Sequence, residues 1–221
     1  MAADILDFKE RLPPQRGHPV AFDSNSGLLA IGGRRIEDDS YKNLVRVWDV
    51  SICQETNRLY HNHTIAHLAF SPNSQMLAVG TSQIWWDWRG VGEVRLWDID
   101  TGEERSFLNS GQVWSLFFSP DGDWLVVNAN RILNTKTGRE VSRIPNKNAY
   151  RAAFSADNRW MATGSLISGN DYISIWAWRP TDLIDRACAR LRRNLTKEEW
   201  NDYLGGEPYR ATCPHLPSAE G

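Results

Sequence analysis

Three histidines form the densest group of potential metal ligands in the sequence. His61, His63 and His67 follow one another at short spacing, and alternate residues of a strand point to the same face of a sheet. Imidazole nitrogen is a common ligand of zinc. The group therefore allows one enzymatic hypothesis, a metal-dependent hydrolase built on these three side chains.

Other reactive side chains do not form a catalytic pattern. Cys213 and His215 could both bind a metal, but no second pair of ligands accompanies them. Acidic residues occur as adjacent pairs such as Glu198-Glu199, and adjacent carboxylates do not converge as acid–base catalysis requires. A GxxxxGK[ST] phosphate loop and a GxSxG nucleophile turn are both missing. The sequence thus predicts no catalytic residue and no cofactor.

The composition of the chain limits the classes of molecule that it could bind and the compartments in which it could occur. The 221 residues carry a formal net charge of −2 and no long Lys/Arg run, which argues against nucleic-acid binding. No segment resembles a signal peptide or a membrane span. The three cysteines are an odd set without a CxxC pair, which is untypical of a secreted disulfide framework. We therefore expect a soluble, cytoplasmic protein.

The chain is organised as four repeats. Residues 70–80 form a turn followed by a strand, and residues 94–98 form a later strand that ends in Trp-Asp. Near-copies of the turn begin at Phe22, Phe118 and Phe154, so that the four starting points are 48, 48 and 36 residues apart. A period near forty with one small sheet per repeat indicates a β-propeller, because a single sheet cannot bury both of its faces alone.

The Phe-Ser-Pro-Asp-Gly turn, the Leu-Ala-x-Gly strand end and the Val-x-Leu-Trp-Asp strand together resemble the WD-repeat family over roughly residues 17–178. The resemblance implies an all-β propeller of four-stranded blades that acts as a non-catalytic scaffold or sensor for protein binding. In the third repeat Ile132-Leu133-Asn134-Thr135 replaces the Trp-Asp strand end. The family carries a histidine at the position of His61 that hydrogen-bonds within its blade, which favours a structural role over a metal site. The resemblance implies structural roles for His61, Trp48, Asp49, Trp97, Asp98 and Trp176.

The sequence divides into three parts: an N-terminal segment at 1–16, four WD-like blades at 17–180 and a helical tail at 181–221. Apolar residues at helical spacing follow Pro180, and Thr196 with Glu199 forms a capping box before a second helix at 197–204 that ends at Gly205. This tail resembles the end of bacterial multidomain WD-repeat signalling proteins. The fourth repeat has no outer strand after it.

That missing strand leaves three alternatives open. Residues 6–12 are in register to serve as the outer strand and to close a four-bladed ring. The chain could instead be part of a larger propeller whose other blades lie on another segment or chain, which we favour because family members mostly have about seven blades. A truncated relic of a signalling protein is the third alternative. Open blade edges would in either incomplete case favour self-association.

Two loops are the candidate partner-binding site. Tryptophan and arginine dominate interface energetics, and both gather in an extended hairpin-like loop at 82–90. A polar loop at 34–43 is expected on the same face and would form a charged rim. The alternative is that Trp86 and Trp88 fill a gap between blades while Trp85 lies over the ring. The predicted binding residues are Trp85, Trp86, Trp88 and Arg89 in the first loop, and Arg34, Arg35 and Tyr41 in the second.

Overall fold

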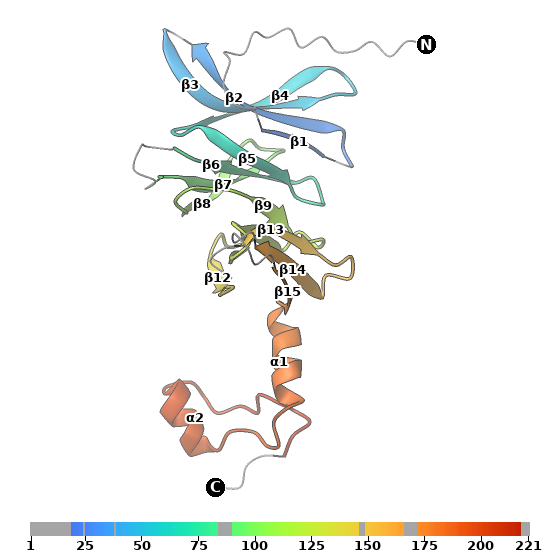
Figure 1. Ribbon diagram of the computed structural model, residues 1–221, viewed down its shortest axis with the longest axis vertical. Helices are drawn as coiled ribbons and strands as arrows, with labels where there is room; N and C mark the ends of the chain where they lie inside the picture. Colours follow the sequence, from blue (N-terminus) through green and yellow to red (C-terminus); the bar gives the residue numbers. More distant parts are fainter. Residues whose placement is uncertain are drawn as a thin grey trace. The chain divides into compact units, whose positions relative to one another are not determined.

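The computed structural model describes residues 19–217 except 24, 38, 84–89, 146–148 and 166–171. Each repeat forms one antiparallel sheet, and two helices follow the last sheet (Figure 1). The segment expected as an outer strand, 6–12, lies outside the described residues. The chain forms two compact units, of which the first holds the chain up to Phe154 with Ala162–Ser174, and the second holds Ser155–Met161 with Ile175–Gly221.

Each of the four sheets is formed by consecutive strands of the chain. The first sheet consists of β1 (Val20–Phe22), β2 (Leu28–Glu37), β3 (Ser40–Asp49) and β4 (Gln54–His61). The second consists of β5 (Ile65–Phe70), β6 (Met76–Thr81), β7 (Glu93–Asp98) and β8 (Glu104–Asn109). The third consists of β9 (Leu116–Phe118), β10 (Trp124–Val127), β11 (Arg131–Asn134) and β12 (Glu140–Arg143). The fourth has three strands, β13 (Ala149–Phe154), β14 (Trp160–Ser165) and β15 (Tyr172–Ala177). The predicted all-β propeller architecture, with four visible blades, is confirmed.

The repeated turn is fixed by a serine hydroxyl. Ser71, Ser119 and Ser155 each accept a hydrogen bond from the backbone amide five residues later, at 2.9, 3.1 and 3.0 Å. Asp23 occupies this position in the first repeat, and its carboxylate accepts a 2.8 Å hydrogen bond from the hydroxyl of Ser74 in the second repeat. Side chains of the turns therefore link the first two sheets as well as closing each turn.

The hydrophobic core lies between the sheets. One cluster joins first-sheet residues such as Val45 and Val47 to Leu77 and Val79 of the second sheet, all fully buried. A second cluster joins second-sheet residues such as Leu96 to the third sheet. The second sheet thus buries one face against the first sheet and the other against the third, which is how small sheets gain a core that none of them could form alone.

The C-terminal unit contains α1 (Pro180–Cys188) and α2 (Lys197–Leu204). The predicted capping box is present at α2, because the amide of Glu199 donates to the Thr196 hydroxyl at 3.0 Å and the amide of Thr196 donates to the Glu199 carboxylate at 2.9 Å. Trp200 of α2 is buried, donates to the carbonyl of Glu207 at 2.9 Å and contacts the ring of Tyr209 edge-on. These contacts give the unit its own small core.

Cys188 and Cys213 form a disulfide, a pairing that the odd number and the spacing of the three cysteines did not predict. The physical reason is the side-chain amide of Asn194, which donates to the carbonyls of Cys213 and Leu216 at 3.0 and 2.9 Å. The backbone amide of Cys213 donates back to the Asn194 oxygen at 2.9 Å. This buried asparagine holds the distant segment beside the end of α1. Cys53 is an exposed free thiol.

Candidate protein-binding site

The segment 34–43 is a β-hairpin, which corrects the expectation of a polar loop. Pairing of β2 with β3 continues without interruption to Glu37 and Ser40. The Ser40 hydroxyl donates to the Glu37 carbonyl at 3.1 Å, and Asp39 takes a left-handed conformation with φ of 59°. Such a conformation suits the tight turns that join paired strands, and aspartate tolerates it better than most residues.

This hairpin extends beyond the strands that flank it. β2 and β3 have 10 residues each, whereas their counterparts β6 and β7 have 6 each. On one side β1 pairs no farther than Ile31, and on the other β4 pairs no farther than Asn43. Among the described residues, no strand therefore pairs with either edge of the tip, and side chains project from both of its faces.

One face of the hairpin carries a stacked arginine and tyrosine. The guanidinium carbon of Arg34 lies 4.0 Å from the centre of the Tyr41 ring, a distance typical of a cation–π contact. The residues are diagonal neighbours in the register, because Arg34 pairs with Asn43 and Tyr41 pairs with Ile36. Tyr41 remains 56% exposed, so the stack orders a large aromatic surface that solvent still reaches.

The opposite face of the hairpin is charged. Tyr60 of β4 donates its hydroxyl to Glu37 at 3.0 Å, and Arg58 lies 3.7 Å from the same carboxylate. Arg35 and Lys42 are directly paired on the hairpin. Arg34, Arg35 and Tyr41 are thus brought together on one short element, where Arg35 is separated from the other two by the thickness of the sheet.

The tryptophan loop is described only at its base. Trp85, Trp86, Trp88 and Arg89 lie outside the described residues. At the base, Gln83 and Val91 form an antiparallel bridge, and the amide of Gln83 donates to the carbonyl of Val91 at 2.7 Å. The Gln83 side chain also contacts His63 Nδ1 at 2.9 Å.

The aspartates of the two Trp-Asp strand ends bind the turns that follow them. Asp49 accepts hydrogen bonds from the hydroxyl and the amide of Ser51 at 2.6 and 2.9 Å, and these bonds lower its pKa in that order. Asp98 accepts from the amide of Thr101 at 3.0 Å and forms an ion pair with Arg105, and these contacts lower its pKa in that order. Both carboxylates therefore stay ionised and act as turn-fixing acceptors.

The tryptophans of these strands pack against neighbouring side chains. Trp48 lies under the guanidinium of Arg46, with 4.6 Å to the ring centre. Trp97 contacts the ring of His61 edge-on, with 5.5 Å between ring centres. Trp176 lies on β15 and is half-buried. The three residues occupy equivalent places at the end of the third strand of their sheets.

His61 is buried without a hydrogen bond. It is 7% exposed, and neither ring nitrogen has a hydrogen-bond partner in the described part of the chain. Burial, with a smaller contribution from the charge of Arg95, lowers its pKa to about 3. The ring is therefore neutral at ordinary pH and contributes through packing, whereas the resemblance implied a hydrogen-bonding role.

The three histidines of the metal hypothesis do not share a strand. His61 ends β4, His63 lies in the turn between sheets, and His67 lies within β5, where burial and then the charge of Arg151 lower its pKa. Among the residues that the structure describes, no three His, Cys, Asp or Glu side chains are placed to hold a metal ion. The hypothesis assumed one continuous strand, and the turn after His61 removes its basis.

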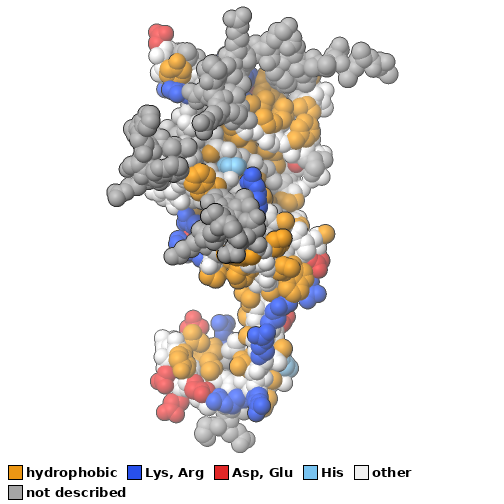
Figure 2. All heavy atoms as spheres, viewed as in Figure 1, with side chains coloured by type: hydrophobic (Ala, Val, Ile, Leu, Met, Phe, Trp, Pro, Cys, Tyr) orange, Lys and Arg blue, Asp and Glu red, His pale blue; other side chains and the backbone are white. Residues whose placement is uncertain are grey.

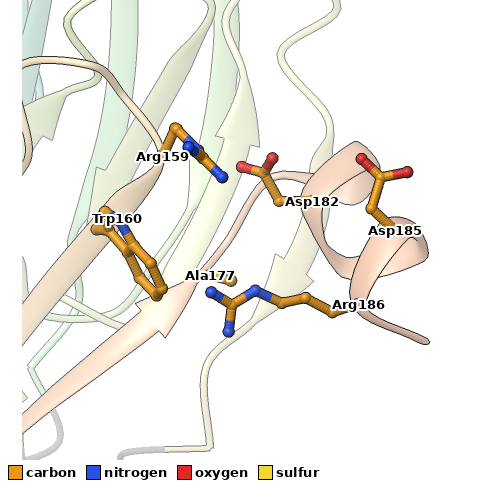
Figure 3. A pocket seen from close by; sticks show the side chains of 6 residues that line it. All are labelled: Arg159, Trp160, Ala177, Asp182, Asp185 and Arg186. Atoms are coloured by element: carbon orange, nitrogen blue, oxygen red, sulfur yellow. The ribbon is translucent and has the colours of Figure 1, made fainter. Parts of the chain in front are cut away.

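Two hollows lie in the C-terminal unit. The smaller, of about 70 Å³, is lined by Arg159, Trp160, Ala177, Asp182, Asp185 and Arg186 (Figure 3). Its Arg186 guanidinium stacks 4.4 Å from the centre of the Trp160 ring. This volume is well below the roughly 300 Å³ at which ligand pockets begin.

The larger hollow, of about 380 Å³, is lined by residues 191–195, Glu199, Thr212 and Cys213. Two of its reactive groups, Glu199 and Cys213, are already engaged. Glu199 bonds to Arg193 at 2.7 Å and caps α2, and the arginine bond is the main reason that its pKa falls to about 2. Cys213 is held in the disulfide. Neither group is poised to exchange a proton or to act as a nucleophile near neutral pH.

Residues 103–133 match the family model of the WD domain, G-beta repeat. The matched segment runs from the end of the second sheet through most of the third. No curated protein matches the chain. The family match and the propeller fold together support a WD-repeat propeller.

Several solved structures share the fold. A chain of the Mitotic Checkpoint Complex is 23% identical, with a TM-score of 0.53 over 72% of this chain and 49% of that one. The β-propeller domain of the Trilobed protease from Pyrococcus furiosus is 12% identical, with a TM-score of 0.52 over 74% of this chain and 55% of that one. Kuenenia stuttgartiensis hydrazine synthase is 12% identical, with a TM-score of 0.55 over 72% of this chain and 58% of that one. The chain spans about half the length of the solved structures that it matches.

A membrane-spanning helix is not found in the described part of the chain, since neither α1 nor α2 has the required length and apolarity.

Proposed function

We propose that this chain is a non-catalytic scaffold that binds a protein partner through the β2–β3 hairpin and the tryptophan loop at 82–90. The observation that carries the proposal is the Arg34–Tyr41 stack on a hairpin that extends past its flanking strands. Arginine and tyrosine are the residue types, with tryptophan, that most often dominate binding energy. A tyrosine ring held in place by its neighbour also loses little conformational freedom when a partner covers it.

We also propose that the chain has no catalytic activity. The ionised carboxylates described above each fix a turn or a helix cap, and the buried His61 stays neutral. One structural neighbour, hydrazine synthase, is an enzyme, but its similarity concerns the fold, and fold alone does not carry function. We further propose that neither nucleic acid nor a membrane is the partner, because the chain has a net charge of −2 and its repeats contain no long Lys/Arg run.

We propose that the protein is located in the cytoplasm. We also propose that it binds its partner within a bacterial signalling assembly, because its tail resembles the end of bacterial multidomain WD-repeat signalling proteins. The Cys188–Cys213 disulfide opposes this location, because disulfides are rare in the reducing cytosol. Thiol labelling before cell lysis would decide: three reactive cysteines per chain support the cytoplasm, whereas one reactive cysteine contradicts it.

The binding proposal is tested by alanine substitution at the hairpin. A partner captured by the immobilised chain and identified by mass spectrometry is purified and titrated against Arg34→Ala/Tyr41→Ala. We expect its dissociation constant to rise at least about tenfold, since truncating an interface anchor commonly costs 2 kcal/mol or more.

A matched control uses the same two residue types elsewhere. Arg210→Ala/Tyr203→Ala removes side chains that are 76% and 77% exposed in the C-terminal unit, and it should leave the dissociation constant unchanged. Equal affinity of the hairpin variant and the wild-type chain would refute the proposal.

A further inference from the structure

The first sheet has an apolar face that its counterparts bury. Val20 and Phe22 of β1 are 58% and 63% exposed. The residues that occupy the place of Val20 in the third and fourth repeats, Leu116 and Ala152, are 7% and 8% exposed. Figure 2 shows hydrophobic side chains at the surface over the first sheet. We call this the leading face; by register it comprises Val20, Phe22, Leu29, Ile31 and Trp48.

The last strand, β15, also exposes apolar side chains whose counterparts in the first two sheets are buried. The residues one and three positions before the strand-end tryptophan are Val47 and Val45 in the first sheet, both 0% exposed, and Leu96 and Val94 in the second, 1% and 2% exposed. In β15 the same positions hold Ile175 and Ile173, which are 68% and 76% exposed. We call this side of β15 the trailing face. Exposed apolar surface of this kind commonly marks an interaction site.

Inside the chain, the repeat equivalents of these two faces pack against each other. The cluster between the first two sheets joins Val45 and Val47 to Leu77 and Val79, with Leu68, Phe70 and Trp97 against it. The second-sheet members of this cluster are the repeat equivalents of the leading face, and the two valines are the equivalents of Ile173 and Ile175. The exposed leading face and the exposed trailing face are therefore the two halves of an interface that the chain already forms internally.

We propose that a second copy of this chain packs its leading face on the trailing face of the first copy, head to tail. A second copy presents both halves with matching chemistry, namely aromatic and aliphatic side chains, with the guanidinium of Arg46 over Trp48, against two β-branched side chains. Two copies would together hold eight sheets, within the range of four to eight blades that propellers show. Two such contacts related by a rotation close a ring of two copies, in keeping with the chain spanning about half of the propellers that it matches.

The test uses one charged substitution on each face, Phe22→Asp and Ile175→Asp, and measures molar mass by light scattering during size-exclusion chromatography. The wild-type chain should show twice its 25.2 kDa mass, and each variant alone should show the single-chain mass. An equimolar mixture of the two variants should regain the doubled mass, because the intact trailing face of one variant meets the intact leading face of the other.

The mixture also separates failed docking from failed folding, because two misfolded variants would not restore the dimer. Ile52→Asp is the matched control: Ile52 lies in the turn between β3 and β4, is 62% exposed and belongs to neither face, so its mass should equal that of the wild type. Mass that exceeds two copies and grows with concentration would also support head-to-tail docking, in an open chain.

Two results would overturn the proposal. One is a wild-type chain that stays at the single-chain mass up to the hundred-micromolar range, which would indicate that a different polypeptide covers both faces. The other is a dimer that Phe22→Asp abolishes and Ile175→Asp leaves intact, which would indicate pairing of two leading faces. None of these variants alters Arg34 or Tyr41, so failure here and failure of the hairpin to bind a partner are distinguishable.

Discussion

Acid should destabilise this protein through His61, and a single substitution isolates the effect. The folded pKa of about 3 lies below the ordinary value of 6.5 because the ring is buried. The unfolded chain therefore binds a proton that the folded chain excludes when pH falls below 6.5. The contribution of His61 to stability is fully present above that pH and is lost on acidification.

The magnitude follows from the pKa difference. Each pH unit between the two pKa values costs up to about 1.4 kcal/mol of unfolding free energy, which amounts to about 2 kcal/mol between pH 7 and pH 5. His61→Phe keeps an aromatic ring against Trp97 and removes two buried nitrogens that have no hydrogen-bond partner in the described residues. Replacing unsatisfied polar atoms by apolar ones of similar shape is close to neutral or stabilising. The variant should therefore match or exceed wild-type stability at pH 7.

The assay is urea denaturation of both proteins at pH 7, 6 and 5, with the free energy of unfolding extrapolated to water. Carboxylates with lowered pKa values, such as Asp23 and Glu55, also lose their contribution toward acid, but they are common to both proteins. The difference between wild type and His61→Phe isolates the histidine, and it should grow by about 2 kcal/mol toward pH 5. Identical pH dependence of the two proteins would refute the reasoning.

Three further predictions concern the loop, the packing of the sheets and the disulfide. Trp85→Ala/Trp88→Ala should abolish partner binding in a pull-down titration with an unchanged circular dichroism spectrum, and unchanged affinity would count against the loop. Gly80→Ala should lower the free energy of unfolding by roughly 1–3 kcal/mol through overpacking, since its Cβ would lie 2.5 Å from a valine methyl of the third repeat; Gly164→Ala, at the same motif position with nothing within 4 Å, should be nearly neutral. Cys188→Ser should destabilise the C-terminal unit by roughly 3 kcal/mol, given a sequence separation of 25 between the bonded cysteines; limited proteolysis that cuts variant and wild type equally fast would contradict this.

Local patterns were sufficient to predict most of the secondary structure. The spacing of the Phe-Ser turns indicated one sheet per repeat, and the absence of a fourth strand after β15 could be read from the helical pattern that follows Pro180. Thr196 and Glu199 predicted the start of α2 because a capping box is a contact between near neighbours in sequence. Each of these features depends on residues within one turn or one strand of each other.

Features that depend on distant residues were missed. The disulfide requires Asn194 to hold the segment around Cys213, and the spacing of the cysteines alone carries no sign of that. The β2–β3 hairpin was predicted as a loop because its charged residues have low strand propensity, although its register simply continues that of the apolar residues before it. The exposure of Phe22 is also invisible in sequence, since the same residue type begins every repeat and differs only in what covers it.

Hydrogen exchange of the chain, alone and saturated with its partner, would test the binding account most directly. We predict that slowed exchange is confined to backbone amides of the hairpin at 33–43 and of the tryptophan loop at 82–92, because a partner held there shields these amides from water. Protection restricted to the C-terminal unit at 197–217, with exchange in the hairpin unchanged, would contradict the account.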